Sequence, residues 1–470
     1  AGQAPTLPQP EANGGLAAPA PAPEPPKPAP EPEAAAPAET EQSERSDKSF
    51  DMAPSAGEGE AESAAPPPPP PEPPLPEASA PTEEAPADQT PSTGGKKKKA
   101  AKRPAAAAES TTESAPFPAG PETTGNAEYH VVDVFYGTSR KRYEGAARVS
   151  YTGDAGDSVE LGHARVTVPV THIVPQVERP WAVRIPGTEM QITLETEDPA
   201  KHFTIKSIEA LPEDQFLAAV RERMGQSRTY KDQALVFVHG FYNTFDDALY
   251  RTAQITYDLQ FDGASFLYSW PSAGTPTAYW NDLPRAQEAG PKLREFLSLV
   301  AHKTGAKRIT VIAHSMGNIP LLEALDESVT TGTPSPDEAI DDVILAAPDL
   351  GRDDFAHLVA HLSHVRGGVT LYASGNDVAM TLSRTLNQGV PRAGDTRYGG
   401  PVLLPHLDTV DASLTSMQMF RINHNYVAEA SGVLCDIENL LRTGLHPPTA
   451  RSRLLESKED AQGTFYTFRP

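Results

Sequence analysis

The segment Ile309 to Leu325, ITVIAHSMGNIPLLEAL, places a serine where an apolar run of strand length meets an apolar pattern of helical period. A serine on a tight strand-to-helix turn can attack a carbonyl carbon, because the turn lifts its hydroxyl clear of the sheet. The turn demands small residues two positions before and after the serine, and Ala313 and Gly317 meet that demand. The alternative is an ordinary joint in which Ser315 caps the helix. The small neighbours and the placement between strand and helix favour a nucleophile at Ser315.

A serine nucleophile needs a base that removes its proton and a carboxylate that orients the base. Asp377 ends the apolar run VTLYASGND, and His424 follows in RINHNYVAEASGVLCDI, just before a terminal amphipathic helix. Serine, acid and histidine is one of the recurrent chain orders of such triads. Asp349, in LAAPDLGRDDF, is the alternative acid, while His406 and His446, in proline-containing stretches, are alternative bases.

Acyl transfer also needs backbone N–H groups that stabilise the negative oxygen of the intermediate. The segment FVHGFYNTFDDAL supplies a His-Gly turn after an apolar run, and we expect the N–H groups of Phe241 and Met316 to form this oxyanion hole. His239 should shape that loop beside the substrate pocket rather than act as a base. The segment SWPSAGTPTAYWNDLPR holds large aromatic residues that could wall the pocket or only pack at a strand edge: Trp270, Tyr279 and Trp280.

The elements that must position these residues are short apolar runs alternating with amphipathic stretches of about 10–15 residues. This alternation predicts an α/β fold with a mainly parallel sheet and helices on both of its faces. Active sites of such sheets lie at the carboxyl ends of the strands. One of the helical patterns spans 286–305, with Pro291 either in a first turn or at a break.

Composition divides the chain into four parts. Residues 1–125 are dominated by Pro, Ala and Glu and have too little apolar area to offset chain entropy, which predicts a disordered tail. Residues 126–230, opening with YHVVDVFYGTSRKR, predict a β-rich section packed on the edge of the domain after it. Residues 231–445 are expected to form that catalytic domain, and 446–470 a C-terminal extension.

Charge narrows the classes of partner. The net charge of −23 argues against general nucleic-acid binding. A basic block from Lys96 to Arg103 could contact an anionic lipid, nucleic-acid or cell-wall surface, or be a solvated charge run. Neither an H-E-x-x-H pattern nor a carboxylate cluster indicates a metal.

Location is less constrained by the sequence. One cysteine, Cys435, excludes an intramolecular disulfide and leaves the redox compartment open. No apolar run reaches the roughly 18–20 residues that span a bilayer. The chain begins at Ala1 without a methionine, so a targeting segment could have been removed. We expect a periplasmic or cell-envelope location, with the cytoplasm as the alternative.

These motifs resemble the α/β-hydrolase superfamily, and most closely a bacterial branch of unknown function that is often labelled esterase- or lipase-like. The resemblance covers about residues 130–443 and rests on VFYGTSR, VFVHGFYNTFDDALYRTAQITYDL, LYSWPSAG, VIAHSMGN, ILAAPDLGRDDF, LYASGNDVAM and INHNYV, in the family's order. It implies Ser315 as nucleophile, Asp377 as acid and His424 as base. The family often has His-Ser-Tyr where this chain has His424-Asn425-Tyr426.

The function implied is hydrolysis of a small-molecule or lipid-like carboxylic ester through an acyl-enzyme, without a cofactor. The same triad serves amidases, lactonases and acyltransferases, which are the alternatives within enzymes. A non-catalytic tethering module, in which the long tail matters more than the pocket, is the alternative from another class. The presence of Ser315, Asp377 and His424 in order argues against that module.

Overall fold

The structure is a computed structural model, and it describes residues 128–145, 148–184, 191–326, 336–415 and 431–470. The predicted tail, its basic block and His424 lie outside these ranges. The described residues all belong to one compact unit, Ala106–Pro470.

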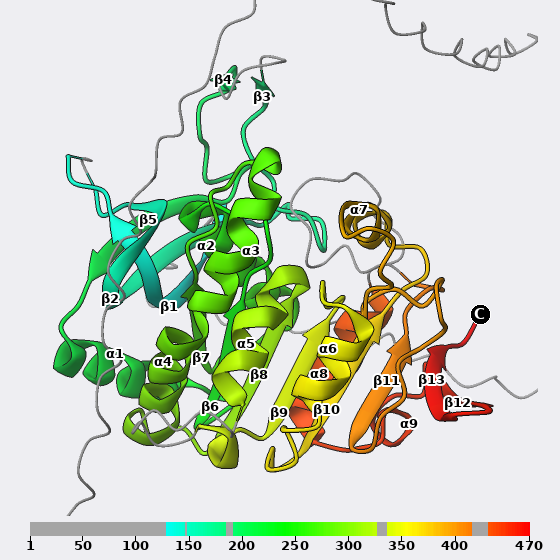
Figure 1. The fold of residues 1–470 in the computed structure, drawn as a ribbon. Helices are drawn as coiled ribbons and strands as arrows, with labels where there is room; N and C mark the ends of the chain where they lie inside the picture. The colour runs from blue at the N-terminus through cyan, green and yellow to red at the C-terminus, as the bar shows by residue number, and fades with distance from the viewer. Residues whose placement is uncertain (1–127, 146–147, 185–190, 327–335, 416–430) are drawn as a thin grey trace, which may run out of the picture. The chain divides into compact units, whose positions relative to one another are not determined.

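A single sheet of 11 strands organises this unit, in the order β12-β13-β11-β10-β9-β8-β6-β7-β1-β2-β5 (Figure 1). Neighbouring strands from β13 to β1 pair in parallel, and the outer pairs β12–β13, β1–β2 and β2–β5 are antiparallel. The central strands are buried along nearly their whole length, which is why they appear in the sequence as continuous apolar runs. They are β6 (Gln233–Val238), β7 (Ala264–Ser269), β8 (Arg308–His314), β9 (Asp342–Ala346) and β10 (Gly368–Ala373). The next strand, β11 (Leu407–Asp411), is less buried and more polar. The prediction of a mainly parallel sheet is confirmed.

Helices cover both faces of the sheet. Alternate side chains of each strand point to opposite faces, so Val236 and Val311 join one core cluster while Phe237 and Ile312 join the other. The first cluster also contains residues of α1 (Glu213–Gln226), α3 (Tyr279–Glu288), α4 (Gly290–Lys303), α5 (Asn318–Leu325) and α6 (Arg352–Val359). The second contains residues of α2 (Phe245–Asp258) and α8 (Ser431–Thr443). Figure 1 shows α4, α5 and α6 side by side across one face.

The strands that precede α1 extend the same sheet. β1 (Tyr129–Arg142) pairs in parallel with β7, and β2 (Tyr151–Pro169) and β5 (Thr204–Ala210) follow it outward. A separate two-stranded sheet, β3 (Ala182–Arg184) with β4 (Gln191–Thr193), lies in the connection between β2 and β5. A β-rich section therefore precedes the α/β part and shares its sheet.

The end of the chain extends the opposite side of the sheet. Helix α9 (Pro448–Arg451) is followed by β12 (Leu455–Asp460) and β13 (Gly463–Phe468), and β13 pairs in parallel with β11. The helical pattern over 286–305 corresponds to two helices, α3 and α4, that meet at Ala289. Pro291 stands in the first turn of α4, where its missing N–H costs no helical hydrogen bond.

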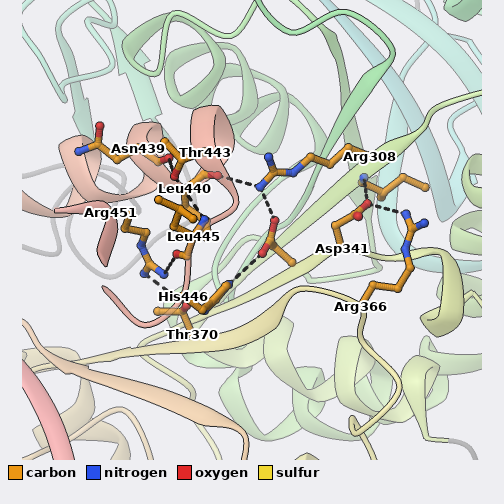
Figure 2. A network of polar contacts seen from close by, with 12 residues as sticks. Arg308, Asp341, Arg366, Thr370, Asn439, Leu440, Thr443, Leu445, His446 and Arg451 are labelled. Carbon is orange, nitrogen blue, oxygen red and sulfur yellow. Dashed lines mark hydrogen bonds and ion pairs between the residues drawn. The ribbon is translucent and has the colours of Figure 1, made fainter. Parts of the chain in front are cut away.

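A charged network joins the amino ends of the strands (Figure 2). The His446 imidazole lies between two carboxylates, with Nδ1 2.5 Å from Asp408 Oδ2 and Nε2 3.0 Å from Asp342 Oδ1. Arg308 donates to the second oxygen of Asp342 at 2.8 Å, and Arg366 pairs with Asp341 at 2.8 Å. Burial alone would lower the pKa of His446, but its hydrogen bonds to the two carboxylates outweigh burial and raise the pKa to about 9.

Candidate functional site

Ser315 occupies a strained backbone conformation at the end of β8. Its φ of 53° lies in the left-handed region, which costs a residue with a side chain about 1–2 kcal/mol. The surroundings hold its carbonyl in place: Asn318 Nδ2 donates to Ser315 O at 2.8 Å, and the Asp349 N–H donates to it at 3.3 Å. The serine begins a short 3₁₀ turn, Ser315–Gly317, while the N-cap of α5 is Gly317. An ordinary helix cap therefore does not explain Ser315.

The turn is crowded, which explains why small residues stand two positions before and after Ser315. A Cβ added to Gly317 would lie 2.3 Å from the carbonyl oxygen of His239 and 2.8 Å from that of Val238. Ala313 is fully buried within β8. The loop after β6 thus packs directly on the backbone of the serine turn, and larger residues at these positions would displace it.

The loop after β6 contains His239, which is buried and held on every side. Its Nδ1 lies 2.8 Å from Gly240 O, its Nε2 3.1 Å from Ser269 Oγ, and its ring stacks on Trp270 with centroids 5.2 Å apart. Burial, helped by the positive charge of Arg140, lowers the pKa of His239 to about 3. The imidazole is therefore neutral at physiological pH and orders the loop.

The next peptide of the loop carries the predicted oxyanion donor. Asn243 Nδ2 donates to Gly240 O at 3.1 Å and to Phe241 O at 2.9 Å, so both carbonyls are turned toward Asn243. Within the described part of the chain, the N–H of Phe241 has no hydrogen-bond acceptor. Met316, the other predicted donor, follows Ser315 and is fully buried.

Asp377 lies at the carboxyl end of β10, as expected, and begins α7 (Val378–Leu386). Its Oδ1 accepts hydrogen bonds from the N–H of Ala379 at 2.8 Å and of Met380 at 3.3 Å, and the residue is buried. This N-cap fixes the carboxylate at the positive end of the helix dipole. β10 is two strands from β8, so Asp377 and Ser315 are separated by roughly 10 Å of sheet and need a residue between them to interact.

Asp349, the alternative acid, belongs to a polar cluster in which both of its carboxylate oxygens accept hydrogen bonds. Its Oδ1 accepts from Arg392 Nε at 2.9 Å and from Ser383 Oγ, and its Oδ2 accepts from the Tyr279 hydroxyl at 3.1 Å. Asn387 Nδ2 donates to the same tyrosine hydroxyl at 2.8 Å. The cluster ties α7 and the start of α3 to the loop after β9, which gives Asp349 a structural task.

The alternative histidines lie away from the serine turn. His446 bonds to Asp342, the first residue of β9, and His406 directly precedes β11. Both therefore stand at the amino ends of strands, whereas Ser315 follows the carboxyl end of β8. His424, the predicted base, is not among the described residues, so its role stays a prediction.

The three predicted pocket aromatics occupy different environments. Trp270 is fully buried and its Nε1 donates to His239 O at 2.6 Å, so it supports the loop after β6. Tyr279 is buried and meets the Phe241 ring edge-on, with centroids 5.4 Å apart. Trp280 is 53% exposed and packs edge-on against Tyr279. Tyr279 thus packs against the loop that carries Phe241, and Trp280 packs on Tyr279.

Sequence reasoning missed the polar residues that hold the site together. Asn318 anchors the serine turn, Asn243 anchors the loop after β6, and Arg140 of β1 reaches the same loop. The asparagines stand within three residues of the motifs they support, which is a usable signal. Arg140 ends the motif VFYGTSR, but nothing local indicates its role, because its partners come from distant segments. No group of three or more His, Cys, Asp or Glu residues suited to a metal, and no helix able to cross a bilayer, occurs in the described ranges.

Residues 214–442 match the family described as "Alpha/beta hydrolase of unknown function (DUF900)". No curated protein matches the chain. Among solved structures, lipase B of Aspergillus fumigatus matches with a TM-score of 0.23 and 15% identity over 40% of this chain and 46% of the lipase. The match thus spans less than half of that lipase. A lipase-esterase related protein of Clostridium acetobutylicum matches with a TM-score of 0.24 and 13% identity over 45% of this chain and 96% of that protein.

Proposed function

We propose that the α/β-hydrolase fold matched over residues 214–442 is an active serine hydrolase that cleaves carboxylic esters, with Ser315 as its nucleophile. The hydroxyl oxygen of Ser315 attacks the ester carbonyl carbon while its proton passes to His424, and Asp377 orients and charge-stabilises that histidine. The tetrahedral oxyanion is bound by the N–H groups of Phe241 and Met316. Collapse expels the alcohol, which takes the proton from His424. Water then releases the carboxylic acid by the same steps.

The observation that carries this proposal is the left-handed backbone of Ser315. Strain of this kind persists where the surroundings over-determine it, and here Gly317, Gly240 and Asn318 all press on or bond to the turn. A structural serine in a strand-to-helix joint would need none of these constraints. The Phe241 N–H, without an acceptor in the described ranges, lies in a loop that packs on the same turn and supports the proposal.

Labelling with a fluorophosphonate tests whether Ser315 is activated, because the reagent reacts with serines that have a working base. Wild-type protein should be labelled at a single peptide that contains Ser315, identified by mass spectrometry. Ser315→Ala should lose both the label and the hydrolysis of p-nitrophenyl acetate while unfolding at the same urea concentration. Ser457→Ala, at an exposed serine of β12, is the matched control and should keep both.

The result separates the proposal from its alternatives. A folded Ser315→Ala protein that still labels would show that another residue reacts. A wild-type protein that neither labels nor hydrolyses any ester would favour the tethering module, and activity on amides, lactones or acyl acceptors alone would favour the related enzymes. The substrate class, a small-molecule or lipid-like ester, is part of this proposal.

A further inference from the structure

Arg140, at the end of β1, is a buried cation whose hydrogen-bonding capacity is completely used. The residue is 3% exposed, and each of the five N–H groups of its guanidinium has an acceptor. The acceptors are Ser269 Oγ at 2.8 Å, Thr152 O at 3.2 Å, Ser272 O at 2.7 Å, His239 Nε2 at 3.3 Å and Asn243 O at 2.8 Å. Two of these acceptors, in His239 and Asn243, belong to the loop after β6.

The contact with His239 settles which ring nitrogen carries the proton. Because Arg140 can only donate, Nε2 must accept, and the proton of the neutral imidazole is on Nδ1. Nδ1–H then donates to Gly240 O at 2.8 Å. The bond between Gly240 and Phe241 is trans, so its N–H points away from its carbonyl. Holding the Gly240 carbonyl toward His239 therefore turns the Phe241 N–H to the other side of the peptide.

We propose that Arg140 is a positioning residue for catalysis: it fixes the His239 tautomer, and through it the Gly240–Phe241 peptide, so that the Phe241 N–H is presented to the oxyanion. This inference rests on the proposed function, since it concerns the same intermediate. It goes beyond that function because the residue lies on β1, outside the segment 214–442 that matches the family.

The charge balance around Arg140 argues for such a role. In the described part of the chain, no carboxylate lies within ion-pair distance of its guanidinium, and the largest favourable charge interaction, with Asp282, acts at longer range. Burying an unpaired guanidinium costs free energy that an apolar side chain at this position would avoid. What the arginine supplies instead is a rigid fork that holds fixed points on the loop after β6, the loop after β7 and β2.

Kinetics of Arg140→Met and Arg140→Lys test this role in the full-length chain. We expect kcat for p-nitrophenyl acetate to fall about 10²-fold in Arg140→Met with little change in KM, because an oxyanion contact strengthens only in the transition state. The rate of fluorophosphonate labelling at Ser315 should fall in parallel. Arg140→Lys should recover at most part of the loss, because a lysine ammonium cannot span the five acceptors.

Arg251→Met is the matched control. Arg251 is 2% exposed on α2, and its guanidinium donates to Gln254 Oε1 at 2.6 Å and Pro175 O at 3.3 Å. Its loss removes an equally buried arginine that lies about two helical turns beyond the loop after β6. We expect lower stability toward urea with an unchanged kcat. A fall in kcat equal to that of Arg140→Met would mean that any loss of packing slows the enzyme, and would overturn the proposal.

The outcomes distinguish this inference from the proposed function. If wild type labels at Ser315 and a folded Arg140→Met protein keeps its kcat, the positioning role is wrong and the serine hydrolase stands. If wild type does not label, both fail. Should Arg140→Met not fold, Ser269→Ala decides, because it removes one acceptor of Arg140 and one contact with the His239 ring. The proposal then requires a fall in kcat of about 10-fold at constant KM, and an unchanged kcat refutes it.

Discussion

Gly240 lies against Ser315 so closely that a methyl group on the glycine would come within 3.0 Å of the serine Cβ. The same methyl group would lie 3.0 Å from the Nδ1 and the carbonyl oxygen of His314. The loop after β6 and the serine turn thus touch at Gly240, where the loop contributes backbone alone. Their spacing is set by the absence of a side chain at residue 240.

Gly240→Ala should slow catalysis more than it destabilises the protein. Its added Cβ must push the loop or the serine turn by a few tenths of an ångström. A misplacement of about 1 Å can cost about 10²-fold in rate, so we expect a smaller but measurable fall here. The measurement is kcat for a p-nitrophenyl ester beside urea unfolding. Gly225→Ala, on α1 with nothing within 4 Å of an added Cβ, is the control and should keep full activity. Equal activity in the two variants would show that the loop yields without consequence.

Replacing Ser315 by glycine should relieve backbone strain. At φ 53°, alanine suffers the same left-handed penalty as serine, whereas glycine does not. We therefore expect Ser315→Gly to be more stable than Ser315→Ala by about 0.5–1 kcal/mol, after allowing for the greater freedom of glycine in the unfolded chain. Urea unfolding of the two inactive proteins measures the difference. An alanine variant as stable as the glycine variant would mean that the turn stores no strain.

Replacing each candidate acid by asparagine should have opposite effects, one on activity and the other on stability. Asp377→Asn keeps an N-cap of equal quality, so stability should change little, but kcat should fall by up to about 10⁴-fold because the histidine loses its orienting carboxylate. Asp349→Asn breaks a buried pair with Arg392 and should cost about 3–5 kcal/mol of folding free energy. Activity per folded molecule should be far less affected. Paired kinetics and denaturation of both variants decide, and a larger fall in kcat for Asp349→Asn would assign the acid to that residue.

The His446 network should make stability depend on pH in the alkaline range. The pKa of His446 is raised from 6.5 to about 9 on folding, so its contribution of roughly 2–3 kcal/mol is complete below pH 6.5. As the pH rises through 9 the folded imidazole also loses its proton, and the contribution disappears. His446→Gln should therefore be destabilised most at pH 6, with the difference from wild type shrinking toward pH 10. Urea unfolding at several pH values measures it, and a difference that grows with pH would contradict the raised pKa.

Trp280→Ala should alter substrate preference without unfolding the protein. The side chain is 53% exposed beside Tyr279, so little apolar burial is lost. If it walls the acyl or alcohol site, preference among p-nitrophenyl esters of increasing chain length should shift by roughly 1–3 kcal/mol in kcat/KM. A uniform change across chain lengths would assign Trp280 to packing alone.

The sheet and the serine turn could be predicted because their signals are local. Buried parallel strands are continuous apolar runs, and the turn around Ser315 reveals itself in Ala313 and Gly317, two residues on either side. The polar residues at strand ends, such as Asp349 and Asp377, follow from the same reasoning. Each of these predictions needs only a stretch of sequence no longer than one strand and the helix after it.

The features that could not be predicted depend on contacts between distant segments. Arg140 stands in a run of polar and basic residues, TSRKR, that gives no hint that one side chain is buried while Arg142 pairs with Glu160 near the surface. The cluster around Asp349 joins two helices and two loops, so no local pattern reveals that both oxygens of its carboxylate accept hydrogen bonds. The burial of Arg140 and the hydrogen bonding of Asp349 both depend on strand register and on which side chains of distant segments pair.

The pairing of β1 with β7 limits how far the protein can be truncated from its N-terminal side. A fragment cut at residue 214, where the family match begins, would lack β1, β2 and β5 and would leave one edge of β7 unpaired along Phe266 to Ser269. Such a bare apolar strand is a template for intermolecular association. Expression of the shortened fragment should therefore yield aggregates, and the smallest soluble unit should begin near residue 128.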